Sequence, residues 1–132
     1  MADVFFDTNV LLYILSTESG KADRAEALLA GGGALSVQVL NEFASVAARK
    51  LNMETAEIRE ILATVRAVCT VVPMTVEIHD LALDLVEQHR FSIYDALIVA
   101  AAQRAGCDVL YTEDLHHGQM IGRLSIRNPF VT

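Results

Sequence analysis

Four carboxylate side chains stand at positions where they could act together. Asp7 ends one short apolar run, and Asp114 closely follows another. Glu42 lies early in a predicted helix after a strand, and Asp95 lies in the first turn of a second predicted helix. Two unit charges about 4 Å apart, at an effective dielectric near 20, repel by about 4 kcal/mol. A cluster of four acids therefore requires cations.

The chemistry of these ligands selects the cation. Hard oxygen ligands without a cysteine or an obvious histidine partner favour Mg²⁺ or Mn²⁺ over zinc. Magnesium held by few carboxylates keeps several water molecules, one of which can be activated as a nucleophile. The cluster therefore predicts a site that hydrolyses phosphodiester bonds.

Each acid also has a structural interpretation. Asp7 suits the N-cap of the helix that follows it. Asp95 completes a capping box that begins at Ser92. Glu42 could face solvent on its helix, and Asp114 could be an ordinary loop acid. Only a meeting of all four at one place favours the catalytic interpretation.

Hydrophobic spacing predicts alternating strands and helices. The predicted strands are residues 4–6, 34–36, 69–72, 109–111 and 124–126. The predicted helices are residues 9–15, 21–29, 37–51, 54–68, 75–90 and 92–104. Strands that are apolar on both faces and alternate with helices indicate an α/β fold with a parallel sheet covered on two sides. Ligands of such sheets bind outside the carboxyl ends of the strands, where the strand order reverses.

Composition limits the class of protein. The 132 residues are 53% hydrophobic and carry a formal net charge of −7, which predicts one folded domain over residues 1–132. The longest apolar run, residues 96–102, is far shorter than the roughly 20 residues that span a bilayer, so we expect a cytoplasmic protein without a membrane partner. A basic protein that coats nucleic acid is excluded. Phosphate substrates remain possible, because bound cations reverse the charge locally.

Four segments, which carry these acids, resemble the PIN-domain nucleases, and more narrowly the VapC-type toxin ribonucleases. They are residues 5–11, 35–43, 91–102 and 110–114. The resemblance follows nearly the whole chain, and four matching segments in order at the expected distances make it specific. Residues 127–130 are similar to one subgroup of such proteins.

The resemblance implies a three-layer α/β/α domain with a central parallel sheet of four or five strands. It also implies a metal-dependent endoribonuclease, the toxin of a type II toxin–antitoxin pair, with an RNA substrate, an antitoxin partner and a homodimeric state. A housekeeping RNA-processing nuclease and a catalytically weak module that binds RNA or protein are the alternatives.

The acidic set of the family falls on Asp7, Glu42, Asp95 and Asp114. In the implied mechanism, the three aspartates hold one Mg²⁺ (or Mn²⁺), and Glu42 supports a second ion or orients the water. Asn9 and Thr112 match positions that orient the acids or their water molecules by hydrogen bonds.

Two histidines and a tyrosine lie close to these acids in the sequence, and their types do not indicate a particular role. The family often has a further acid shortly after the fourth, where this chain has Leu115 and the pair His116 and His117. The number of metal ions therefore stays open, and we expect both histidines in a solvated turn. We expect Tyr94 to pack in the core rather than to stack on an RNA base.

Overall fold

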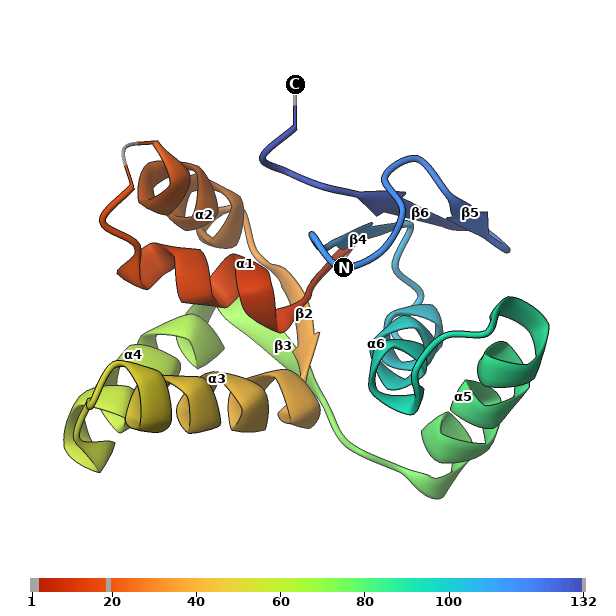
Figure 1. Cartoon of the computed structure of the whole chain (residues 1–132), viewed down its shortest axis with the longest axis horizontal. Coiled ribbons are helices and arrows are strands. Elements are labelled where there is room, and N and C mark those ends of the chain that lie inside the picture. Colours follow the sequence, from red (N-terminus) through yellow and green to blue (C-terminus); the bar gives the residue numbers. More distant parts are fainter. Residues whose placement is uncertain (1–2, 19, 132) are drawn as a thin grey trace.

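The computed structural model describes residues 3–18 and 20–131 and places a six-stranded sheet between two groups of helices (Figure 1). The strands are β1 (Val4–Phe6), β2 (Gly33–Ser36), β3 (Cys69–Val72), β4 (Val109–Tyr111), β5 (Met120–Ile121) and β6 (Leu124–Arg127). Their order in the sheet is β3-β2-β1-β4-β6-β5. All neighbouring strands pair in parallel except β5, which is antiparallel to β6.

The helices form the two outer layers. They are α1 (Thr8–Leu12), the 3₁₀ helix η1 (Tyr13–Leu15), α2 (Lys21–Ala30), α3 (Val37–Lys50), α4 (Thr55–Val68), α5 (Val76–His89) and α6 (Ile93–Arg104). Figure 1 shows α5 and α6 on the opposite side of the sheet from α1 to α4. The predicted three-layer α/β/α class is therefore confirmed.

Two details differ from the sequence-based prediction. The predicted helix over residues 9–15 begins at Thr8 and tightens into η1 after Leu12. The sheet has six strands rather than four or five, because β5 adds a short edge strand. A two-residue strand is too short to show a hydrophobic period, so its existence depends on pairing with β6.

Local capping explains where several helices begin. The side chains of Ser36, Thr75 and Ser92 each accept a hydrogen bond from the backbone N–H three residues later, at the starts of α3, α5 and α6. Each bond satisfies one of the N–H groups that a helix N-terminus leaves without a partner. The N-terminal positions of α3 and α6 are thereby set, and both helices carry an acid near this end.

The core lies on both faces of the central strands. Phe5, Phe6, Leu35 and Leu110 are fully buried. Helix α6 is apolar around most of its circumference, since it packs against both the sheet and α5. None of the helices in the described ranges is long and apolar enough to cross a membrane.

The strand order changes direction at the centre of the sheet. From β1 the chain adds β2 and β3 on one side, and then crosses to add β4 and β6 on the other. The order therefore reverses between β1 and β4, which is where parallel sheets bind ligands. Asp7 directly follows β1, and Thr112 directly follows β4.

Candidate active site

Asp7 is a buried carboxylate at the carboxyl end of β1. It is the N-cap residue of α1, and its Oδ1 accepts a hydrogen bond of 2.7 Å from the Thr8 backbone N–H. Its Oδ2 accepts a second bond of 2.7 Å from the Thr112 hydroxyl. The side chain is only 4% exposed. Asp7 therefore caps its helix and also points its second oxygen toward the end of β4.

The Thr112 hydroxyl joins three site residues. It donates to Asp7 and accepts from the Asp114 backbone N–H at 3.0 Å and from Asn9 Nδ2 at 3.4 Å. Asn9 Oδ1 in turn accepts from the Glu113 backbone N–H at 3.3 Å. A hydroxyl has one hydrogen and two lone pairs, so Thr112 uses its full capacity. Its single proton must point at Asp7, which fixes the orientation of that carboxylate.

Glu42 is held by two side chains that the sequence analysis did not identify. Its Oε1 accepts from the Thr8 hydroxyl at 3.2 Å and from Gln38 Nε2 at 3.1 Å. Gln38 Nε2 also donates to the Tyr94 backbone carbonyl at 3.2 Å. The i, i+4 spacing of Gln38 and Glu42 on one helix is the only signal in the sequence that could have indicated this contact.

Asp95 and Asp114 complete the acidic group from two further elements. Asp95 is half-buried in the first turn of α6, where its backbone N–H donates to Ser92 Oγ at 3.1 Å. The serine half of the predicted capping box is thus present. Asp114 is exposed, on the loop after β4. Its charge acts on both Asp7 and Asp95, as does the charge of Glu42. The structure therefore brings the four acids together at one edge of the sheet.

Burial and repulsion between carboxylates dominate the electrostatics of this site. Burial raises the pKa of Asp7 to about 6, and the Asp114 and Glu42 charges add to the effect, against two hydrogen bonds that lower it. Burial and the Asp114 charge also raise the pKa of Asp95. Two ion pairs occur among the described residues, Lys21–Glu18 and Arg123–Asp108, and neither involves the four acids.

The donor set fits a hard divalent cation by its chemistry. All four donors are carboxylates, which Mg²⁺ and Mn²⁺ prefer, and a cation would supply the missing charge. Within residues 3–18 and 20–131, no group of three aspartate, glutamate, histidine or cysteine side chains is arranged so that it could already hold a metal ion. Binding would therefore draw the acidic side chains closer together.

The raised pKa of Asp7 predicts how stability depends on pH in the metal-free protein. Its pKa is about 6 in the folded state against 3.8 ordinarily, so the folded state holds more protons between about pH 4 and 6. The free energy of unfolding should therefore fall as pH rises through this window, by about 3 kcal/mol from this group. The free energy of unfolding, measured by denaturant in the presence of chelator, should show this fall in the wild type and not in Asp7→Asn. The same dependence on pH in both proteins would contradict the prediction.

Tyr94 and two histidines near the site lie at the surface. Tyr94 is 66% exposed, so the prediction that it packs in the core is wrong. It lies at the surface because the buried side of α6 faces the sheet and α5, and Tyr94 falls outside that side. His116 and His117 are exposed, as expected, and His117 Nδ1 accepts from the Asn128 backbone N–H at 2.9 Å.

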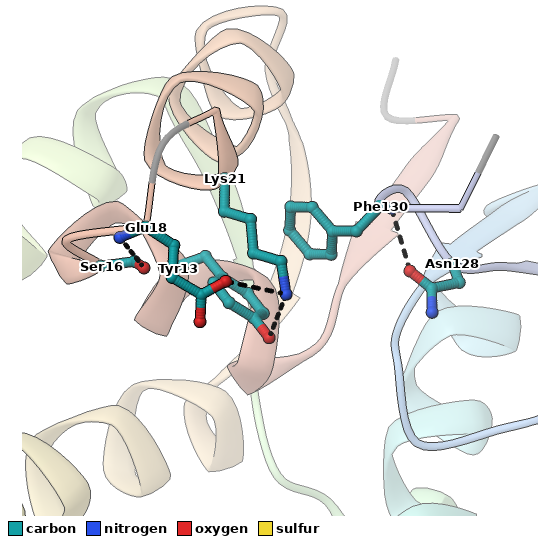
Figure 2. A network of polar contacts seen from close by, with 6 residues as sticks. All are labelled: Tyr13, Ser16, Glu18, Lys21, Asn128 and Phe130. Carbon is teal, nitrogen blue, oxygen red and sulfur yellow. Dashed lines mark hydrogen bonds and ion pairs between the residues drawn. The ribbon is translucent and has the colours of Figure 1, made fainter.

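A second network joins the C-terminal segment to η1 and α2 (Figure 2). The Phe130 and Tyr13 rings are 4.5 Å apart between centroids, and Lys21 Nζ lies 3.3 Å from the Tyr13 hydroxyl. Lys21 also pairs with Glu18 at 3.4 Å. Burial, followed by the neighbouring Glu113 carboxylate, raises the pKa of Tyr13. The network thus connects the chain end to the loop that carries Asp114.

Comparison with known proteins identifies one family and several solved structures with a similar fold. The family model described as PIN domain matches residues 4–120. No curated protein sequence gives a match. Similar solved structures include a toxin–antitoxin complex from Klebsiella pneumoniae, with a TM-score of 0.71 and 21% identity over 96% of this chain and 98% of that chain.

Two further structures share the fold. Mycobacterium tuberculosis VapC20, described as a sarcin–ricin loop cleaving toxin, has a TM-score of 0.69 and 20% identity over 84% of this chain and 89% of its own. DNA-bound VapBC from Salmonella typhimurium has a TM-score of 0.67 and 19% identity over 98% and 99% of the two chains. At these identities the likeness shows a common fold.

Proposed function

Because the chain belongs to the PIN domain family, whose members are nucleases, we propose that it is a metal-dependent endoribonuclease and the toxin of a type II toxin–antitoxin pair. The observation that carries the proposal is the gathering of Asp7, Glu42, Asp95 and Asp114 beyond the carboxyl ends of the central strands, without a compensating ion pair among the described residues. Such a group of carboxylates suits metal-assisted hydrolysis of phosphodiesters.

The proposed roles combine the family resemblance with the hydrogen bonds around the acids. Asp7, Asp95 and Asp114 would hold Mg²⁺ or Mn²⁺, with Glu42 in support. When bound, the cation supplies a water of lowered pKa and offsets charge that develops on the phosphate. Thr112 orients Asp7 and the backbone of Asp114, while Thr8 holds Oε1 of Glu42.

The proposed partners come from the structural neighbours. Several are toxin–antitoxin complexes, some of them bound to DNA. We therefore expect this chain to bind an antitoxin protein. The family resemblance adds the expectations that it forms a homodimer and acts on RNA in the cytoplasm. The VapC20 description makes the sarcin–ricin loop a suitable first RNA probe.

The proposal is tested by incubating the purified chain with ribosomal RNA, a sarcin–ricin loop oligonucleotide and a DNA oligonucleotide of the same sequence. We expect internal cleavage of RNA in the presence of Mg²⁺ or Mn²⁺ and intact DNA. Binding of RNA without any cleavage would instead support the alternative of a catalytically weak binding module.

The orienting role of Thr112 predicts a specific loss of activity. Thr112→Val keeps the side-chain shape but removes the donor to Asp7 and the acceptor for Asp114 and Asn9. Loss of a group that orients metal ligands reduces activity or metal affinity by about 10–100-fold. The matched control is Thr64→Val on the surface of α4, where the hydroxyl only donates to a carbonyl of its own helix. Equal RNA cleavage by both variants would refute the role.

A further inference from the structure

Gln38 connects two of the acid-bearing elements. It lies in the first turn of α3, is 8% exposed, and uses both hydrogens of its amide nitrogen. One bond of 3.1 Å goes to Oε1 of Glu42, on the same helix. The other, of 3.2 Å, goes to the carbonyl of Tyr94, the residue before Asp95 in α6. A single side chain therefore relates the position of Glu42 to the N-terminus of α6.

The orientation of this amide is determined by its neighbours. Both groups that face Nε2 are oxygen acceptors, a carboxylate and a carbonyl. A flipped amide would set its oxygen against both of them, so only the nitrogen can occupy this position. The orientation leaves Oε1 of Gln38 buried without a hydrogen-bond partner among the described residues.

A buried acceptor without a partner lowers the stability of the fold. Gln38 therefore does not maximise the stability of the fold, because an apolar side chain of similar size would leave no unsatisfied acceptor. Its partners do not depend on it for their own satisfaction. Glu42 Oε1 also accepts from Thr8, and the Tyr94 carbonyl lies in the first turn of α6, where carbonyls accept helical hydrogen bonds. A buried polar atom without a protein partner calls for an explanation, and a role of its residue in a site is one such explanation.

We propose that Gln38 is a positioning residue that fixes Glu42 relative to Asp95, and thereby sets the affinity of the acidic site for a divalent cation. The inference rests on the proposed nuclease function and adds a residue to it. The Glu42 charge acts on Asp95, so their relative position determines how much negative charge a cation meets. Without the amide, α6 and the Glu42 side chain are free to settle further apart.

The test compares Gln38→Met with Gln103→Met in the full-length protein. Methionine keeps the unbranched shape of glutamine and removes both polar atoms of the amide. Gln103, on α6, is the matched control, because its Nε2 donates to the Ile121 carbonyl at 3.1 Å on the side of the fold away from the acids. Three quantities are measured for each variant: the metal-free melting temperature, Mn²⁺ binding by electron paramagnetic resonance, and RNA cleavage.

We expect Gln38→Met to melt at or above the wild-type temperature, because the buried acceptor is gone. Its dissociation constant for Mn²⁺ should rise about 10-fold or more, and cleavage at limiting metal should fall in proportion. Gln103→Met should melt at a lower temperature and bind Mn²⁺ as the wild type does. A merely structural role would instead lower the melting temperature of Gln38→Met and leave its Mn²⁺ affinity unchanged.

The outcomes separate the inference from the function on which it rests. Wild-type Mn²⁺ affinity and cleavage in Gln38→Met, with an active wild type, would overturn the inference alone. A wild type that neither binds Mn²⁺ nor cleaves RNA would overturn the proposed function and this inference with it.

Discussion

Asp7→Asn should reduce RNA cleavage by about 10²–10³-fold or more while leaving the domain folded. The variant keeps an oxygen for the Thr8 backbone N–H, so the cap of α1 survives. It loses the charge that would hold the cation and places an amide nitrogen opposite the Thr112 hydroxyl. The magnitude is that expected when a preorganised electrostatic group of an active site is removed.

Stability should change in the opposite direction from activity. Burial raises the pKa of Asp7 to about 6, so its charged form is disfavoured in the metal-free fold at pH 7. Asparagine removes this charge, and the loss of the Thr112 bond offsets about 1 kcal/mol of the gain. We expect the variant to be more stable than the wild type by about 2 kcal/mol in chelator.

The control for this variant is Asp84→Asn, which removes a carboxylate from the exposed face of α5. It should cleave RNA at the wild-type rate. Cleavage rates and denaturant unfolding curves of the three proteins are compared in the same buffer. If Asp7→Asn remained active, Asp7 would be only a helix cap, and the mechanism proposed for this site would fail.

Removal of divalent cations should abolish cleavage completely, and Mg²⁺ or Mn²⁺ should restore it. The four acids meet without an ion pair among the described residues, and two of them have raised pKa values. A cation relieves this repulsion, so it should also stabilise the fold. At about 100 times its Kd, Mg²⁺ should add roughly 2.7 kcal/mol to the free energy of unfolding.

Thermal unfolding with and without Mg²⁺ measures this stabilisation independently of activity. Asp7→Asn should gain less from the cation than the wild type, whereas Asp84→Asn should gain the same. Unchanged cleavage in EDTA would eliminate metal-assisted hydrolysis. A melting temperature insensitive to metal would favour the module that binds RNA or protein without cutting.

Local patterns in the sequence were sufficient to predict most elements of the fold. The bonds that start α5 and α6 join residues only three positions apart, at Thr75 and Ser92. Hydrophobic spacing likewise reports which face of one element is buried, since side chains three or four apart share a helix face. The positions of the four acids after strands or near helix starts were therefore visible without a structure.

The tertiary structure decided how these elements meet. The bond between Asn9 and Thr112 spans 103 residues, and that between Gln38 and Tyr94 spans 56. Such contacts depend on strand order and helix packing, which a local pattern does not encode. The burial of Asp7, the exposure of Tyr94 and the pairing of β5 have the same origin. The sequence by itself determined which residues carry charge and which elements present them, while packing between distant segments determined their hydrogen bonds and pKa values.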